Sequence, residues 1–197
     1  MKKSRWLIGL GLLAVVAAGP VAAQPTTGLY AGASVGYSQF KDICEAVVAG
    51  VSCDDNDTAW RAFGGYQFNE YFALEFGFAN LGAATGSGAP GSFSVEAKEA
   101  FDLSALVTIP VATRLSLLLR LGAHRVRTTV DQEGPSFGAL HEAKTGSGFT
   151  LGAGVEYSFG KLGVRAEWQR YDNVATGTVA EDDIDVASAL ELNLRLE

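Results

Sequence analysis

Hydrophobic and polar residues alternate along most of this chain, in segments of about ten residues. In the segment 184–197, Leu190, Leu192 and Leu194 lie on one face and Glu191 lies on the other. A period of two is typical of a β-strand with one apolar face. The segments with this pattern are 28–40, 58–68, 72–78, 97–109, 114–125, 149–159, 162–171 and 184–197.

The connections between these segments also alternate, in length. Short connections are expected around Asn69-Glu70, Pro110 to Thr113 and Gly160-Lys161, and long polar loops are expected near 41–57, 82–95, 126–147 and 173–184. All the long loops would then lie at one end of an up-and-down meander. Outer-membrane barrels have this layout, so the pattern predicts an all-β fold, an eight-stranded antiparallel up-and-down transmembrane β-barrel.

The composition of the two strand faces indicates which one is the inside. A soluble barrel turns its apolar face inward, whereas a membrane barrel turns it toward lipid. Here the charges on the polar face are sparse and are separated by glycine, serine and alanine, as a narrow interior requires. The apolar face carries aromatic residues near both strand ends, which suits the two membrane interfaces. These are Tyr66, Phe68, Phe72, Tyr157 and Phe159 near the short turns, and Tyr37, Trp60, Phe78, Phe101 and Trp168 near the long loops.

Charged residues on the polar faces would then point into one lumen. A two-residue hairpin at Gly160-Lys161 places Glu156 opposite Arg165, and a three-residue turn after Phe68 places Glu75 opposite Gly65. Buried charges persist when they are paired, so we expect an ion-pair network that plugs the barrel. Its predicted members are Arg61, Glu75, Arg120, Glu156, Arg165 and Glu167. Two carboxylates that act as acid and base on a sugar would need an open cleft, which an eight-stranded barrel lacks.

The N-terminus carries an export signal. Lys2, Lys3 and Arg5 precede a short apolar run, and small residues precede Gln24. We expect residues 1–23 to be a cleaved signal peptide and residues 24–197 to form the barrel, with an uncleaved anchor as the alternative. The net charge of −7 includes this basic leader, so the mature chain is more acidic still. An acidic net charge argues against nucleic acid as a partner. It also limits contact with anionic lipid to local or cation-bridged sites.

Cysteine and histidine chemistry narrows the function further. Cys44 and Cys53 are the only cysteines, and in an exported chain they predict a disulfide that closes a small loop; an incomplete zinc site is the alternative. No metal or cofactor is expected, since the acidic stretches lack the ligand spacing of a calcium loop. His124 and His141 have no serine placed to form a nucleophile and base pair, so we expect no catalytic residues and no enzyme.

Four stretches together resemble the transmembrane domain of the OmpA-like outer-membrane proteins. They are "GLYAGASVGYSQF", "AFGGYQFNEYFALEFGFANLG", "GAGVEYSFG" and "VRAEWQRYDN". The resemblance implies an eight-stranded barrel whose lumen is closed by charged pairs, with matching positions at Glu75, Glu156 and Arg165. The family's lysine on the first strand falls at Ser34, where Arg61 or Arg120 would have to substitute.

The resemblance also carries expectations about partners and ends. Outer-membrane lipid, lipopolysaccharide and the barrel assembly machinery are the implied partners. Larger relatives carry a peptidoglycan-binding domain after the barrel, so cell-wall tethering is not expected here. Barrels that end at their last strand usually finish on an aromatic residue, whereas this sequence finishes at Leu196-Glu197. We expect a monomer, because a closed barrel needs no partner to cover its edges.

Three function classes follow from this fold. The first is a non-enzymatic outer-membrane barrel of a Gram-negative bacterium that supports envelope integrity and displays its loops outside the cell. The second is a narrow gated pore for small solutes or ions. The third is a lipid-modifying barrel enzyme, which the histidine positions disfavour.

Overall fold

The computed structural model describes residues 27–41, 43–44, 50–89, 91–135, 138–174 and 182–196. The predicted signal peptide at 1–23 lies outside the described residues and stays a prediction. In the described part of the chain, no helix is long and apolar enough to cross a membrane.

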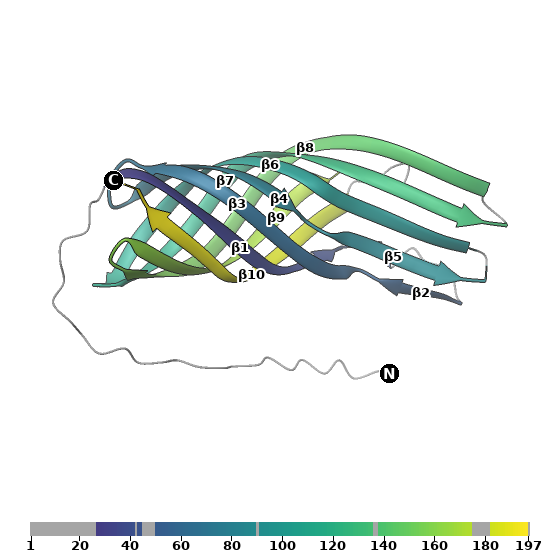
Figure 1. Cartoon of the computed structure of the whole chain (residues 1–197), viewed down its shortest axis with the longest axis horizontal. Coiled ribbons are helices and arrows are strands. Elements are labelled where there is room, and N and C mark those ends of the chain that lie inside the picture. The colour runs from purple at the N-terminus through teal and green to yellow at the C-terminus, as the bar shows by residue number, and fades with distance from the viewer. Residues whose placement is uncertain are drawn as a thin grey trace.

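The described chain forms ten β-strands (Figure 1). They are β1 (Gly28–Phe40), β2 (Val51–Asp54), β3 (Asn56–Gln67), β4 (Phe72–Asn80), β5 (Ala83–Gly88), β6 (Gly91–Ala112), β7 (Leu115–Gly134), β8 (Gly138–Phe159), β9 (Leu162–Val174) and β10 (Asp182–Arg195). Eight of them close an antiparallel ring in the order β1-β3-β4-β6-β7-β8-β9-β10, because β10 pairs back with β1 and β6 pairs with β7. The predicted eight-stranded barrel is confirmed.

The strand register agrees with the two turn predictions. Phe159 pairs with Leu162, and Glu156 lies opposite Arg165. Gly65 lies opposite Glu75 on the other hairpin. Because side chains alternate with a period of two, this register sends Glu75, Glu156 and Arg165 to the same side of the sheet.

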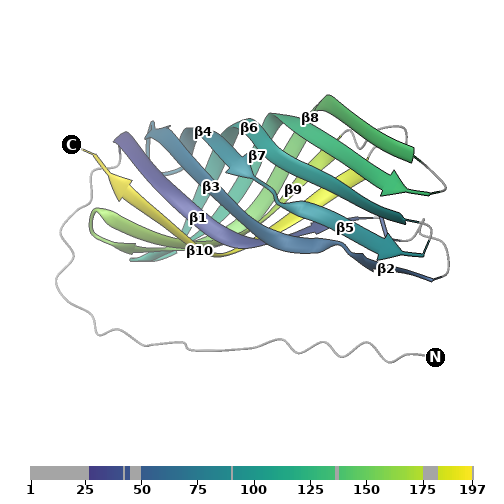
Figure 2. The same ribbon diagram turned by 45° about the vertical axis from the view of Figure 1, so that its right-hand side comes forward.

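Two of the four predicted long loops are wrong. Most of 82–95 and 126–147 is strand: β5 occupies part of the first, and the extended ends of β6, β7 and β8 occupy the rest. The alternation continues there in a weaker form, with buried Val95, Ala97, Val126 and Val130. Adjacent strands continue to satisfy each other's backbone groups, so the polar composition does not end the sheet. β2 lies within the predicted loop 41–57 and pairs only with β5, at the end where the ribbons extend past the ring (Figure 2).

Lys98 also departs from its predicted face. The sequence pattern groups it with the inward Asp102 and Ser104, but its side chain is 57% exposed and contacts Glu96. A register irregularity between Ala97 and Glu99 inserts one extra residue into β6. Such a bulge reverses the alternation on one side of it, which turns Lys98 outward.

The apolar strand faces point away from the barrel axis. Phe72 is 52% exposed and Phe76 is 53% exposed, whereas Glu75 between them is fully buried. The lipid-facing leucines Leu117, Leu119 and Leu121 are exposed in the same way on β7. An exposed apolar surface around the whole ring is stable in hydrocarbon and unfavourable in water.

The lumen contains a charged layer and, toward the long-strand end, an apolar layer, here called the apolar plug. A second buried apolar cluster lies beside the charged layer toward the short turns and comprises Tyr30, Phe63, Ala73, Leu106 and Leu118. The plug comprises Phe40, Ala59, Ala79, Leu81, Ala84, Ala97, Ala100, Val126, Tyr171, Val174, Ile184 and Val186, all of them buried. Both layers fill the interior with side chains, as expected for eight strands.

Candidate functional site

The structure brings the six predicted lumen residues together. Arg61 comes from β3, Glu75 from β4 and Arg120 from β7, and they are 4%, 0% and 2% exposed. Glu156 comes from β8, and Arg165 and Glu167 come from β9; these three are buried as well. Five strands of the ring therefore place charges at one level of the lumen.

Each arginine has one carboxylate of its own. The guanidinium of Arg61 donates from Nε and Nη2 to the two carboxylate oxygens of Asp102, at 2.9 and 2.8 Å. Arg120 donates from Nε to Glu167 Oε1 at 2.5 Å and from Nη2 to Oε2 at 3.1 Å. Paired parallel hydrogen bonds of this kind are the strongest contact between arginine and a carboxylate.

The third arginine has a wider set of partners. Arg165 donates to Glu156 Oε2 from Nε at 3.2 Å and from Nη2 at 3.0 Å. Its Nη1 lies 2.5 Å from Glu191 Oε1 and 3.7 Å from Glu167 Oε2. Asn193 donates to the same oxygen of Glu156 at 3.1 Å. Arg165 therefore joins β8, β9 and β10 across the inside of the barrel.

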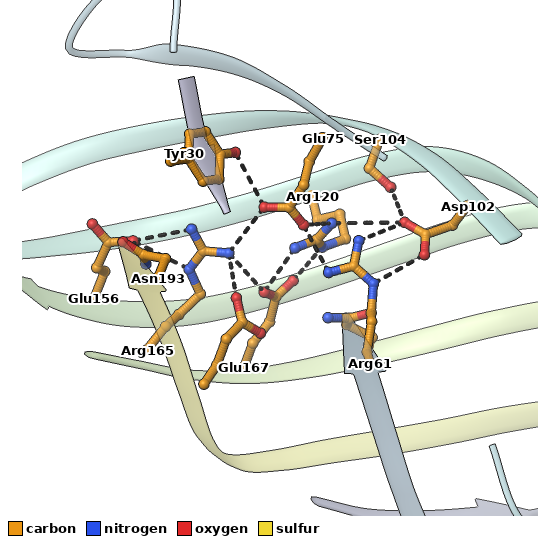
Figure 3. Close-up of polar contacts among 12 residues, drawn as sticks. Tyr30, Arg61, Glu75, Asp102, Ser104, Arg120, Glu156, Arg165, Glu167 and Asn193 are labelled. Atoms are coloured by element: carbon orange, nitrogen blue, oxygen red, sulfur yellow. Dashed lines mark hydrogen bonds and ion pairs between the residues drawn. The ribbon is translucent and has the colours of Figure 1, made fainter. Parts of the chain in front are cut away.

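Glu75 lies at the centre of the network (Figure 3). Its Oε1 is 2.8 Å from Arg61 Nη1 and 2.7 Å from Arg120 Nη1, and its Oε2 is 3.4 Å from Arg165 Nη1. The hydroxyl of Tyr30 donates to Oε2 at 3.1 Å. A single buried carboxylate thus contacts all three guanidinium groups.

Glycines opposite the long side chains make room for this arrangement. A Cβ at Gly65 would clash with the Tyr30 ring, and a Cβ at Gly77 would clash with the Arg61 and Asp102 side chains. The space that the sequence predicted above Gly65 is therefore occupied by Tyr30 from β1.

Sequence reasoning missed part of the network. Asp102 and Glu191 are 2% and 0% exposed and bind Arg61 and Arg165 directly. The alternation already placed both on polar faces, so the signal was present. What the sequence lacked was the strand register: the long connection at 173–184 does not determine which residue faces Glu191, and in the structure it is Arg165.

The histidines occupy two different places. His124 is buried, with its ring edge against Tyr171 and its Nδ1 3.1 Å from Thr150 Oγ1. His141 is exposed and contacts Asp131. No group of three or more potential metal ligands occurs within the described ranges.

The predicted disulfide is confirmed. Cys44 and Cys53 are bonded, with their Cα atoms 5.7 Å apart. Because Cys53 lies on β2, the bridge is outside the closed ring of eight strands.

The closed ring with its charged lumen agrees with the comparison with known families. The family model described as "OmpA-like transmembrane domain" matches residues 24–196. This chain belongs to the OmpA-like transmembrane domain family. It is a Gram-negative outer-membrane β-barrel.

Curated relatives of this OmpA-like barrel include outer membrane protein A from two enteric bacteria. The Klebsiella aerogenes protein is 30% identical over 186 residues, which cover 91% of this chain and 51% of the relative. The Salmonella typhi protein is 28% identical over 177 residues, which cover 88% of this chain and 49% of the relative. The chain therefore spans about half the length of the curated relatives it matches.

Solved structures show the same fold at low sequence identity. Neisserial surface protein A aligns with a TM-score of 0.54 and 15% identity, covering 88% of this chain and 100% of that one. OprG from Pseudomonas aeruginosa aligns with a TM-score of 0.51 and 13% identity, covering 87% and 95%. At these identities the likeness concerns the barrel architecture alone.

Ser34 is the position at which the resemblance implied a lysine. This residue is buried on β1, opposite Arg61 on one side and opposite Glu191 on the other. Arg61 and Arg120 both reach Glu75. Two arginines thus contact the central carboxylate at a level where β1 contributes only a hydroxyl.

Proposed function

We propose that this chain is a non-enzymatic structural barrel that supports the integrity of the outer membrane and displays its long-strand end outside the cell. The observation that carries the proposal is the filled lumen. Eight buried charged side chains, the apolar plug and the second apolar cluster occupy the interior. A barrel closed in this way supports a structural role more directly than a transport role.

The apolar plug closes the lumen independently of the ion pairs. Breaking one ion pair could open a path through the charged layer, but Leu81, Ile184 and Tyr171 still fill the next layer and are about 1% exposed or less. A hydrophobic constriction resists the passage of water and ions. Rearranged ion pairs would therefore be insufficient for conduction, which weighs against the gated-pore alternative.

The outward charges beyond the aromatic belt support contact with lipopolysaccharide. Lys41 and Arg170 contact Asp185 at 2.7 and 2.8 Å on the outer surface, near Trp168. Arg127 on β7 is 59% exposed on the same outer surface. Basic side chains next to an interfacial aromatic belt are suited to the phosphate groups of outer-leaflet lipid.

The closed ring supports one further part of the proposal. β1 pairs with both β3 and β10, so the ring of eight strands has no free edge that needs a second subunit. We therefore include a monomeric state in the proposal. Insertion by the barrel assembly machinery is the route that we propose for its biogenesis.

Planar-bilayer recording of the purified protein tests the closed lumen. We expect the wild type to show no steady openings, and we expect the same of the outward control Arg127→Ala. Steady openings in the wild type that are abolished by Glu156→Ala or Arg165→Ala, but not by Arg127→Ala, would support the narrow pore and overturn the structural proposal.

The envelope role needs a separate measurement in cells. Deleting the gene should increase the entry of a large hydrophobic antibiotic, and expressing the wild-type barrel should restore the barrier. Unchanged antibiotic entry after deletion would contradict the envelope proposal while leaving the closed lumen intact.

A further inference from the structure

The charges buried in the lumen do not balance. The described network contains the guanidinium groups of Arg61, Arg120 and Arg165. The carboxylates facing them are Glu75, Asp102, Glu156, Glu167 and Glu191, each 8% exposed or less. Five carboxylates against three guanidinium groups leave an excess of negative charge in a water-poor interior. An unpaired buried carboxylate is so unfavourable that such groups usually take up a proton.

The contacts identify the carboxylate that is compensated least. Asp102 and Glu167 each accept two hydrogen bonds from their own arginine, and Glu156 accepts two from Arg165 together with one from Asn193. Glu75 contacts three arginines and accepts a hydrogen bond from Tyr30. Each of these four carboxylates therefore makes two or more contacts with arginine nitrogens.

Glu191 is the exception. Among the described residues, its Oε1 contacts only Arg165 Nη1, while its Oε2 is buried and has no hydrogen-bond partner. Arg165 already binds Glu156 through its two other nitrogens. Glu191 is also fully buried, so water cannot solvate the second oxygen.

The groups around Glu191 increase this imbalance. Ser34 lies directly opposite it on β1 and brings no charge. Glu167 on β9 and Glu75 on β4 act on it as like charges. Arg165 on β9 and Arg120 on β7 are positive charges that attract Glu191. Both arginines also bind other carboxylates: Arg120 binds Glu167, and Arg165 binds Glu156 on β8.

We propose that Glu191 is a proton-binding site, whose Oε2 carries a proton in the folded barrel at neutral pH. Binding a proton removes one negative charge from the excess and needs no additional volume. A metal ion would require several oxygen ligands around it, and the described residues contain no such group. The inference is independent of the proposed envelope role.

Protonation in the folded state has a consequence for stability with a definite sign. In the unfolded chain a glutamate ionises above about pH 4.3. If the folded barrel keeps the proton, its contribution to stability is complete below that pH and is lost as pH rises. Glutamine is the neutral counterpart of a protonated glutamate, so Glu191→Gln removes this loss.

Infrared spectroscopy of the folded barrel in lipid vesicles tests the proton directly. At pH 7 we expect a band from a protonated carboxylic acid in the wild type and its loss in Glu191→Gln. The matched control Glu99→Gln, whose side chain is 56% exposed and pairs with Arg127, should keep the band. An absent band in the wild type, or a band that persists in Glu191→Gln, would overturn the proposal.

Equilibrium unfolding in urea gives a second readout. Between the pH at which the unfolded glutamate ionises and the pH at which the folded one does, the folding equilibrium constant of Glu191→Gln should increase relative to the wild type by about tenfold per pH unit. A ratio that does not change with pH would refute the assignment. Failure of Glu191→Gln to fold would also refute it, because a residue that is already neutral tolerates a neutral isostere. If wild-type stability instead required sodium and no acid band appeared, a metal cation would replace the proton and the proposal would be wrong.

Discussion

Replacing Arg165 by methionine removes the cation that joins three strands inside the barrel. In the wild type this guanidinium group contacts four carboxylates, at 2.5 Å for Glu191, 3.0 Å for Glu156, 3.4 Å for Glu75 and 3.7 Å for Glu167. Methionine fills similar space without charge, so the main effect is electrostatic. The variant lumen would hold two guanidinium groups against five carboxylates.

The expected loss is large because the site is buried. Removing one partner of a buried ion pair destabilises a protein by about 3–5 kcal/mol, and this position has more than one partner. We expect Arg165→Met to lower the free energy of unfolding by at least about 3 kcal/mol at pH 7. The loss should shrink as pH falls, because protons then neutralise the orphaned carboxylates.

The assay is urea unfolding in lipid vesicles, followed by tryptophan fluorescence and by heat-modifiable migration on a gel. Arg127→Met is the matched control, since Arg127 lies 3.7 Å from Glu99 on the surface and is 59% exposed. That control should change the free energy of unfolding by less than about 1 kcal/mol. Equal effects of the two substitutions, or a loss that does not depend on pH, would refute the reasoning that the lumen is dry and its charges are coupled.

Two further substitutions test the outer surface and the disulfide. Leu119 is 48% exposed near the middle of the membrane-spanning part of β7. Leu119→Arg should lower the free energy of unfolding in lipid by about 2–4 kcal/mol, whereas the control Val111→Arg, near the short turns, should lower it by about 0–1 kcal/mol. Equal losses of the two variants in urea titrations would argue against the assigned membrane position. Cys53→Ser should speed protease cleavage between Cys44 and Cys53. It should leave heat-modifiable migration on a gel unchanged, because the bridge lies outside the ring. A loss of folded barrel on the gel would show that the bridge supports the ring itself.

The sequence alone was sufficient to predict the ring of eight strands and to predict which strand face points into the lumen. Alternation is a local property, because successive side chains on a strand point to opposite sides regardless of which strands lie next to it. A few residues of sequence were therefore enough to predict that Phe72 and Glu75 lie on opposite faces. The hairpin at Gly160-Lys161 was also local, and it was enough to place Glu156 opposite Arg165.

The ends of the strands were less predictable. Polar composition suggested loops at 82–95 and 126–147, but extended pairing between β5, β6, β7 and β8 keeps these residues in the sheet. Pairing with a neighbouring strand supplies backbone hydrogen bonds that composition does not reveal. The bulge at Lys98 likewise depends on the register with β7.

Only the tertiary structure decided which charges meet in the lumen. Arg61 and Asp102 are 41 positions apart, Arg120 and Glu167 are 47 apart, and Arg165 and Glu75 are 90 apart. Alternation determines that such residues face inward, but the level at which each lies depends on the closure of β10 against β1 and on the stagger between strands. For the same reason the sequence could place Glu191 on an inward face, while only the closed barrel showed that its second oxygen has no partner.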